Sequence, residues 1–512
     1  MSKYPTPGGI RLRLLLCVIV GWIALAGLPA TGADWRFNVQ FSENAHRGSF
    51  TGRVYLAFTK SPGEPRRAPS NWFRPEQFVA LDVVNWQPGE TLTFAANGSE
   101  PPLAYPVPLA DMKLAGYRAQ AIARFNPHAR TVGTGAGNGY SSVVVIGEEV
   151  SNGRAAQFLI DQLVPAPQFK ETRWSKLLQM RSGLLSDFHH RDVTTQAAVI
   201  LPASYYDEPN RRYPTIFIIP GFGGTHFRGI RGEPVKERNP DGVEFIRVLL
   251  DPSCPLGHHV FADSANNGPV GRALVAEFIP EFDRRFRSVA DPAARFLTGH
   301  SSGGWSSLWL QVTYPEHFSG TWSTAPDPVD FRDFQQINLY DGNNMYVDSQ
   351  GQRRPLARSG GRVLIWYKDF ADREWVLGYG EQLHSFEAVF SPRDAGGHPR
   401  LLWDRRTGEV DVQVAKTWEA FDIRLILERN WTALAPKLRG KLHVFMGDTD
   451  TFHLEGATIL LKQSLEQLGS DAVVEIHRGK NHSNLLTPEL RSRINIEMAR
   501  RFQTLTQRTG AP

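Results

Sequence analysis

The feature that most restricts the fold of this chain is a glycine-rich pentapeptide near its middle. Gly299 to Gly303 has the pattern G-x-S-x-G, with Ser301 at its centre, and it lies between a short apolar segment and a segment compatible with a helix. In that setting the pattern is typical of a nucleophile elbow, a sharp turn from a strand into a helix. Glycine lets the strand and the helix pack closely because it has no Cβ. We therefore expect the elbow to expose the Ser301 hydroxyl.

The segments downstream place an acid and a histidine after this serine. Lys441 to Met446 predicts a strand that ends close to Asp450. Ala457 to Leu468 has apolar residues at helical spacing, and Ala472 to Ile476 predicts a further strand before a polar loop that contains His482. Loops at the carboxyl ends of the strands can bring both side chains to the serine. The chain order serine, acid, histidine is that of nucleophile-elbow hydrolases.

Each of these side chains has an expected role. A serine hydroxyl is a weak nucleophile at neutral pH, so His482 would remove the Ser301 proton and later protonate the leaving alcohol. Asp450 would hold the imidazole in one tautomer and stabilise its cationic form. Asp448, in the same loop, is the alternative acid. Asp327, which follows another predicted strand, is a third candidate.

Four other histidines compete with His482 for the role of base. We expect His300 to point away from the apex of the elbow, in a packing role, and His453 to line the pocket. His443 and His477 fall on strand patterns, which favours structural roles for both.

An acyl-transfer site also needs donors for the oxyanion of its tetrahedral intermediate. One donor is expected to be the backbone N–H of Ser302, the residue after the nucleophile. Tyr213 to Ile219 predicts a parallel strand covered on both faces, because it is a β-branched run without charges. The glycine-rich loop after this strand would supply the second donor, the N–H of Phe222 or, alternatively, of Gly223.

The C-terminal part of the chain resembles the putative esterase family of α/β-hydrolases, which includes esterase D and enterochelin esterases. The resemblance implies an α/β-hydrolase fold and a cofactor-free serine hydrolase that acts on carboxylic esters. Members include feruloyl and acetylxylan esterases, S-formylglutathione hydrolases and mycolyltransferases. Pro220 stands where many members have histidine. The matching stretches are Val199–Tyr205, Tyr213–Gly224, Phe296–Gly304, Gly447–Asp450 and His482.

These motifs leave the reaction open in two respects. The same residues can transfer an acyl group to an alcohol other than water, as in mycolyltransferases. A glycan-binding protein with an inactive hydrolase domain is the other alternative, although the complete set Ser301, Asp450 and His482 argues against inactivity. The expected partner is an ester substrate, linked to a carbohydrate or to an aromatic acid.

Residues 1–33 differ in composition from the rest. Lys3, Arg11 and Arg13 precede an unbroken apolar run from Leu14 to Leu28, and small residues follow it. These are the parts of a secretory signal peptide, and the run is short for a membrane span. We therefore expect a secreted or periplasmic protein without stable membrane insertion after the leader is removed.

The charge, the cysteine content and one loop argue against nucleic-acid binding, cysteine catalysis and metal binding. Three basic residues of the leader contribute to the formal net charge of +5, so the mature chain is near neutral and offers no case for nucleic-acid binding. Cys254 would be its only cysteine, and we expect it to be structural because no base stands beside it in the sequence. The loop from Asp263 to Pro269 lacks two features of a calcium loop, so we expect no metal.

Two domains are predicted after the leader. Residues 34–165 contain short alternating strands separated by turn signals, which predicts a β-sandwich-like domain. Residues 166–194 would hold a linker and the first strands, and residues 195–512 the α/β-hydrolase domain, in which Val260 to Ala262 predicts a strand. Residues 332–422 form an aromatic-rich insertion typical of a lid. Its aromatic side chains would either face the substrate or form the insertion's own core.

Overall fold

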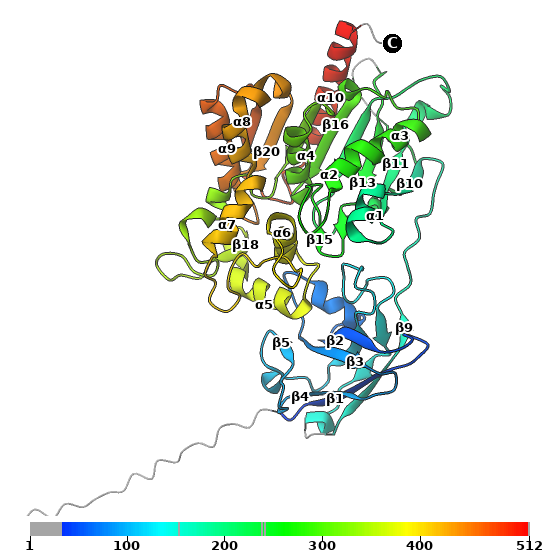
Figure 1. The fold of residues 1–512 in the computed structure, drawn as a ribbon, viewed down its shortest axis with the longest axis vertical. Helices are drawn as coiled ribbons and strands as arrows, with labels where there is room; N and C mark the ends of the chain where they lie inside the picture. Colours follow the sequence, from blue (N-terminus) through cyan, green and yellow to red (C-terminus); the bar gives the residue numbers. More distant parts are fainter. Residues whose placement is uncertain (1–32, 152–153, 237–238, 240–241, 510–512) are drawn as a thin grey trace, which may run out of the picture.

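The computed structural model describes residues 33–151, 154–236, 239 and 242–509. The predicted leader therefore lies outside the described residues, apart from its last residue. In the described ranges, no helix has the length and apolar character needed to cross a bilayer. The expected mixed α/β fold is confirmed: a sheet from the N-terminal part lies below a sheet flanked by helices in the view of Figure 1.

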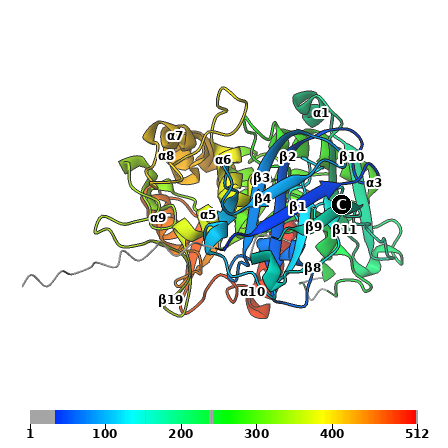
Figure 2. The same cartoon turned by 90° about the horizontal axis from the view of Figure 1, so that it is seen from below.

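The N-terminal part contains nine described strands that pair into one sheet, in the order β4-β1-β9-β7-β6-β2-β3-β5, with β8 paired to β6. A sandwich would have two separate sheets. Here β1 pairs with β4 on one side and with β9 on the other, and so joins the strands into one sheet. Figure 2 views this sheet from its outer side. The strands are β1 (Arg36–Phe41), β2 (Phe50–Thr59), β3 (Phe78–Trp86), β4 (Leu92–Ala95), β5 (Leu103–Tyr105), β6 (Arg118–Ala123), β7 (Gly139–Ser141), β8 (Val144–Val145) and β9 (Ala156–Leu163).

Strand β2 shows how this sheet attaches to the rest of the molecule. Alternate side chains of a strand point to opposite faces. Leu56 and Phe58 pack into the domain's own core, whereas Tyr55 and Ala57 pack on the other face, in a cluster that includes Val376. The sheet is therefore buried on both faces at this strand, and one face meets the insertion.

The second sheet has the strand order β10-β11-β13-β12-β16-β17-β20-β21. The strands from β13 to β21 are parallel, whereas β11 is antiparallel to both of its neighbours. The predicted strands around residues 213–219, 296–298, 441–446 and 472–476 are confirmed. The strands are β10 (Ser175–Arg181), β11 (Thr194–Ile200), β12 (Thr215–Ile219), β13 (Ile246–Leu250), β16 (Arg295–His300), β17 (Gly320–Thr324), β20 (Leu442–Gly447) and β21 (Val473–His477).

Helices cover both faces of this sheet. Phe296 and Phe445 face Ile494 and Met498 of the C-terminal helix α10, and Phe217 on the opposite face packs with residues of α3 and α4. The helices that follow the strands are α1 (Gly183–His189), α2 (Val270–Ala273), α3 (Ile279–Arg285), α4 (Ser302–Thr313), α8 (Ile423–Leu438), α9 (Glu455–Gln467) and α10 (Pro488–Thr509).

The strand expected at Val260 to Ala262 is wrong. Val260 and Phe261 have φ angles of 45° and 54°, which a strand cannot contain. The segment is apolar because it is a buried turn. It follows the short hairpin of β14 (Ser253–Cys254) and β15 (Gly257–His258), and the strand of the large sheet in this region is β13.

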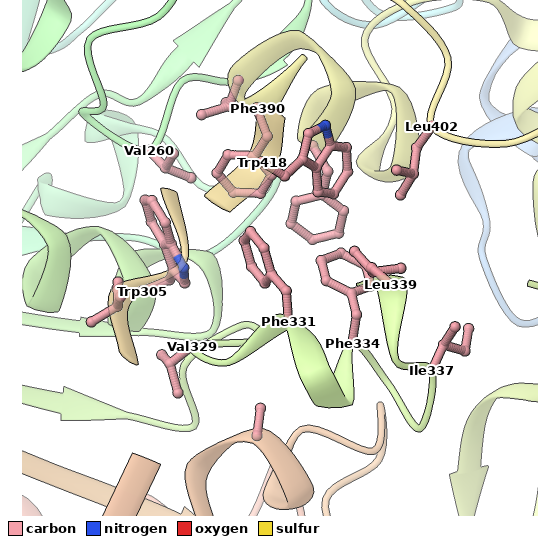
Figure 3. Close-up of a cluster of buried hydrophobic side chains, with 14 of the residues drawn as sticks. Val260, Trp305, Val329, Phe331, Phe334, Ile337, Leu339, Phe390, Leu402 and Trp418 are labelled. Carbon is pink, nitrogen blue, oxygen red and sulfur yellow. The ribbon is translucent and has the colours of Figure 1, made fainter. Parts of the chain in front are cut away.

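The insertion of residues 332–422 lies between the two sheets in Figure 1. Its aromatic side chains mostly pack in a core that is shared with α4, β20 and α9 of the α/β domain. Figure 3 shows Phe331, Phe334, Phe390 and Trp418 pointing toward one another, close to Trp305 of α4. The insertion consists of β18 (Pro355–Ser359), β19 (Arg362–Trp366), α5 (Tyr367–Leu377), α6 (Gln382–Phe390) and α7 (Val412–Trp418).

Candidate active site

The elbow holds Ser301 in a turn between β16 and α4, with φ 61° and ψ −128°. Two glycines make this turn possible. A Cβ on Gly299 would lie 2.0 Å from the carbonyl oxygen of Gly303, and a Cβ on Gly303 would lie 1.9 Å from that of Ile219. Neither position accepts a side chain without displacing the helix from the sheet. The close packing expected from the motif is therefore present.

The loops after β20 and β21 bring Asp450 and His482 together. Nδ1 of His482 lies 2.8 Å from Oδ2 of Asp450, whose side chain is fully buried. The other carboxylate oxygen accepts a hydrogen bond from the backbone N–H of Phe452 at 2.8 Å. The ring of Phe452 packs edge-on against the imidazole, with the ring centroids 4.9 Å apart. The acid and the histidine are thus fixed relative to each other.

Asp448 has a different environment. Its carboxylate accepts a hydrogen bond from the N–H of Gly479 at 2.7 Å, and its own N–H donates to the carbonyl of His477. Asp448 therefore connects the loops after the two last strands. Asp450 is the acid that the structure places against His482.

Asp327 lies beside the serine rather than beside the histidine. The Ser301 hydroxyl donates to Oδ1 of Asp327 at 3.4 Å, and the Ser302 hydroxyl donates to Oδ2 at 2.5 Å. Gln382 of α6 reaches the same carboxylate at 3.5 Å. Burial raises the pKa of Asp327 to about 6. Among the described hydrogen bonds, the Ser301 hydroxyl donates to Asp327 and not to His482.

Of the other histidines, His300 does not point away from the site as expected but lines the same cavity as Ser301 and His482, whereas His443 and His453 are packed within the fold. The ring of His300 lies 4.7 Å from that of His482, and burial lowers its pKa to about 4. His443 stacks on Trp322, with the ring centroids 4.2 Å apart. His453 does not line the pocket as expected but is buried, and burial lowers its pKa to about 4.

Ser301 and His482 both line a cavity of about 810 Å³. The insertion contributes Phe370 and Phe386 to its wall, so only a small part of the insertion's aromatic content faces the cavity. Trp72 of the N-terminal domain also lines it. Sequence reasoning missed Trp72, because nothing in the sequence connects it to an elbow more than 200 residues away.

The loop Pro220–Gly224, which follows β12, lies next to the elbow. A Cβ on Gly221 would lie 3.0 Å from the carbonyl oxygen of His300 and 3.1 Å from Cβ of Ser301. The N–H groups of Phe222 and Gly223 make no hydrogen bond within the described part of the chain. Ser302 is the first residue of α4, where backbone N–H groups have no partner within the helix. Donors are therefore available on both sides of Ser301.

Two other segments singled out in the sequence have structural roles. Sγ of Cys254 lies 3.5 Å from Oδ1 of Asn267, and burial raises the pKa of the thiol to about 12. The carboxylate of Asp263 accepts hydrogen bonds from the N–H groups of Gly271 and Arg272 at the start of α2. The loop that begins at Asp263 lies away from the cavity that contains Ser301.

This geometry can be compared with known proteins. Residues 191–355 match the family described as "Putative esterase". The chain carries a putative esterase domain. The matched segment contains the elbow and the Pro220–Gly224 loop, and the family resemblance predicted from these motifs is confirmed. No curated protein matches the chain.

Similar solved structures include a ferulic acid esterase, with 12% identity, a TM-score of 0.38 and coverage of 64% of this chain and 99% of that chain. An S-formylglutathione hydrolase from Agrobacterium tumefaciens has 13% identity, a TM-score of 0.38 and coverage of 64% and 95%. A "putative dipeptidyl aminopeptidase IV" from Bacteroides ovatus has 11% identity, a TM-score of 0.36 and coverage of 84% and 48%. Identities and TM-scores this low carry no information about substrate.

Proposed function

We propose that this protein is a serine esterase that cleaves carboxylic esters through an acyl-enzyme on an α/β-hydrolase-type domain. The observation that carries the proposal is the contact of 2.8 Å between His482 and Asp450 at the cavity that also contains Ser301 on its elbow. The family match to residues 191–355 supports the same reaction class. The ester substrate would be linked to a carbohydrate or to an aromatic acid.

The reaction would begin with rotation of the Ser301 hydroxyl from Asp327 toward His482. Nε2 of His482 then takes the hydroxyl proton while Oγ attacks the ester carbonyl carbon. The N–H groups of Ser302 and Phe222 donate to the oxyanion that forms. Collapse of this intermediate breaks the bond to the alcohol, which leaves with the proton from His482. Water, activated by the same imidazole, then releases the acid from Ser301.

Residues 1–33 bear on where in or outside the cell the protein acts, and we propose that it is exported. Their basic start, apolar run and small residues support export to the periplasm or the medium. The expected mature protein begins near Asp34, and intact-mass measurement of protein from the extracytoplasmic fraction tests this. A mass that includes the leader would contradict cleavage without affecting the proposed chemistry.

The test of the chemistry is the variant Ser301→Ala, assayed with short p-nitrophenyl esters and with a fluorophosphonate probe that reacts only with an activated serine. We expect loss of both activities with an unchanged circular dichroism spectrum. Ser253→Ala, on β14 and away from the cavity, is the matched control and should retain both. Full activity in Ser301→Ala would reject the proposal. Product analysis with an added alcohol distinguishes hydrolysis from acyl transfer on the same acyl-enzyme.

A further inference from the structure

We propose that the N-terminal domain is a working part of the active site, because Trp72 and Arg130 position the Pro220–Gly224 loop through the ring of Phe222. This inference rests on the proposed function, in which the N–H of Phe222 donates to the oxyanion. It assigns a task to residues 34–165 that neither the family match nor the sequence motifs provide.

The two contacts on Phe222 come from different segments of the N-terminal domain. The ring of Trp72 lies 5.6 Å from the Phe222 ring between centroids, with 36° between the planes. The guanidinium carbon of Arg130 lies 4.9 Å from the Phe222 centroid, within the range of a cation–π contact. The ring and the N–H of Phe222 share one Cα, so contacts that fix the ring also restrict the direction of the N–H.

The start of the same loop is held from within the α/β domain. Nε2 of His258 lies 2.9 Å from the carbonyl oxygen of Pro220. Nδ1 of this imidazole accepts a hydrogen bond from the N–H of Val260, so the ring proton of the neutral form must be on Nε2, which donates to Pro220. Burial lowers the pKa of His258 to about 4, and the ring is therefore neutral at physiological pH. Phe222, two residues further on, depends on the N-terminal domain instead.

Trp72 and Arg130 can position the loop only if the N-terminal domain is itself held against the α/β domain. Contacts with α5 hold it there. Side chains of the N-terminal domain donate to backbone carbonyls at and after the end of α5, a region where carbonyls lack partners within the helix. Arg373 of α5 is fully buried and donates in return to the carbonyl of Pro69, at 2.6 and 2.9 Å. These donations are from Arg53 of β2 to Trp375 and Val376, from the Tyr55 hydroxyl of β2 to Leu377, and from Arg124 and Arg130 of the loop after β6 to Tyr379 and Gly380.

The chain offers a matched pair of variants that separates docking from loop positioning. Arg124 and Arg130 are both half-buried, and they donate to the adjacent carbonyls of Tyr379 and Gly380, at 2.8 and 3.2 Å. Arg130 contacts the Phe222 ring, whereas the described ring contacts of Phe222 do not include Arg124. Arg124 also donates to the carbonyl of Ala129, next to Arg130, at 3.0 Å. Arg124→Gln and Arg130→Gln therefore both weaken the domain contact, but only the second removes a group that contacts the Phe222 ring.

The measurements are kcat and KM for a p-nitrophenyl ester, the rate of phosphonylation by a fluorophosphonate, and Tm. We expect Arg130→Gln to lower kcat and the phosphonylation rate about tenfold or more, with little change in KM, because a misplaced donor is lost in the transition state and not in the ground state. Arg124→Gln should lower Tm to a similar degree and retain kcat. Trp72→Leu should also lower kcat and the phosphonylation rate, and it replaces Arg130→Gln if that variant does not fold. Because Trp72 lines the cavity and its ring lies 6.1 Å from that of Phe452, Trp72→Leu should change KM as well.

Equal kcat and phosphonylation rates in Arg124→Gln, Arg130→Gln and Trp72→Leu would overturn the inference while leaving the proposed esterase intact. A native chain that neither hydrolyses the ester nor reacts with the probe would reject the proposed function, and the inference with it. A loss confined to the Arg130 and Trp72 variants supports both.

Discussion

Asp450 is fully buried, and its Oδ2 lies 2.8 Å from Nδ1 of His482. A carboxylate accepts hydrogen bonds, so this contact requires the proton of the neutral imidazole on Nδ1. Nε2 is then the nitrogen with a free lone pair, and in the proposed reaction it is the atom that would take the Ser301 proton. The contact therefore selects the nitrogen that would act as the base.

Replacement of Asp450 by asparagine should favour the wrong tautomer, because the amide offers a donor to Nδ1. We expect kcat/KM for a p-nitrophenyl ester to fall by a factor on the order of 10³–10⁴. Asp448→Asn is the control, since Asp448 contacts Gly479 and not the imidazole. It should lower stability slightly and retain kcat. Similar losses of kcat in the two variants would contradict the assignment of the acid.

Asp327 makes the stability of the protein depend on pH. Burial raises its pKa from 3.8 to about 6, so its ionised form is disfavoured in the folded state. This carboxyl therefore destabilises the fold as pH rises from about 4 through 6, with a cost of at most about 3 kcal/mol above that range. Asp327→Asn should raise Tm more at pH 7.5 than at pH 4.5. The exposed Asp207→Asn serves as control, and the same Tm difference at both pH values would refute the prediction.

Gly303 is expected to tolerate no side chain. Its Cβ would lie 1.9 Å from the carbonyl oxygen of Ile219, so α4 would have to move away from β12. Gly303→Ala should lower the free energy of unfolding by about 3 kcal/mol or more and abolish fluorophosphonate labelling. Gly232→Ala meets nothing within 4 Å and should change stability by less than about 0.5 kcal/mol. Urea unfolding of both variants provides the test, and equal stabilities would count against close packing at the elbow.

Cys254 should play no part in catalysis. Because burial raises its pKa to about 12, the thiol is protonated at pH 8 and is a weak nucleophile there. Iodoacetamide at pH 8 should therefore leave esterase activity unchanged, and Cys254→Ser should retain kcat. Inactivation by the reagent, with modification mapped to Cys254, would be the contrary result.

The sequence was most informative where local pattern and chemistry agree. The elbow around Ser301 consists of a strand, a helix and two glycines at positions that have no room for a Cβ. Each of these parts has a recognisable sequence pattern. The order of acid, helix, strand and histidine predicted that Asp450 and His482 follow adjacent strands. Loop position favoured Asp450 over Asp448 but left Asp448 as an alternative, because the sequence does not record where each carboxylate points; in the structure Asp450 contacts His482 and Asp448 contacts Gly479.

Other features depend on contacts that no local pattern records. The turn at Val260 and Phe261 is apolar because it is buried. A buried turn and a buried strand both give a short apolar run, so the sequence does not distinguish them. Trp72 lies in an irregular segment of the N-terminal domain, and it reaches the cavity only because its domain docks on α5. The pairing of β1 with both β4 and β9, which unites the first sheet, is equally non-local.

The side chains that donate to the carbonyls around the end of α5 belong to the N-terminal domain, between 250 and 322 residues earlier in the chain. If the N-terminal domain unfolded alone, these carbonyls would lose their donors, and the buried guanidinium of Arg373 would lose the carbonyl of Pro69 and keep Glu381. Unfolding of one domain while the other stays folded would therefore cost additional free energy. Scanning calorimetry of the whole mature chain should show one endotherm rather than two, as if the halves were a single cooperative unit.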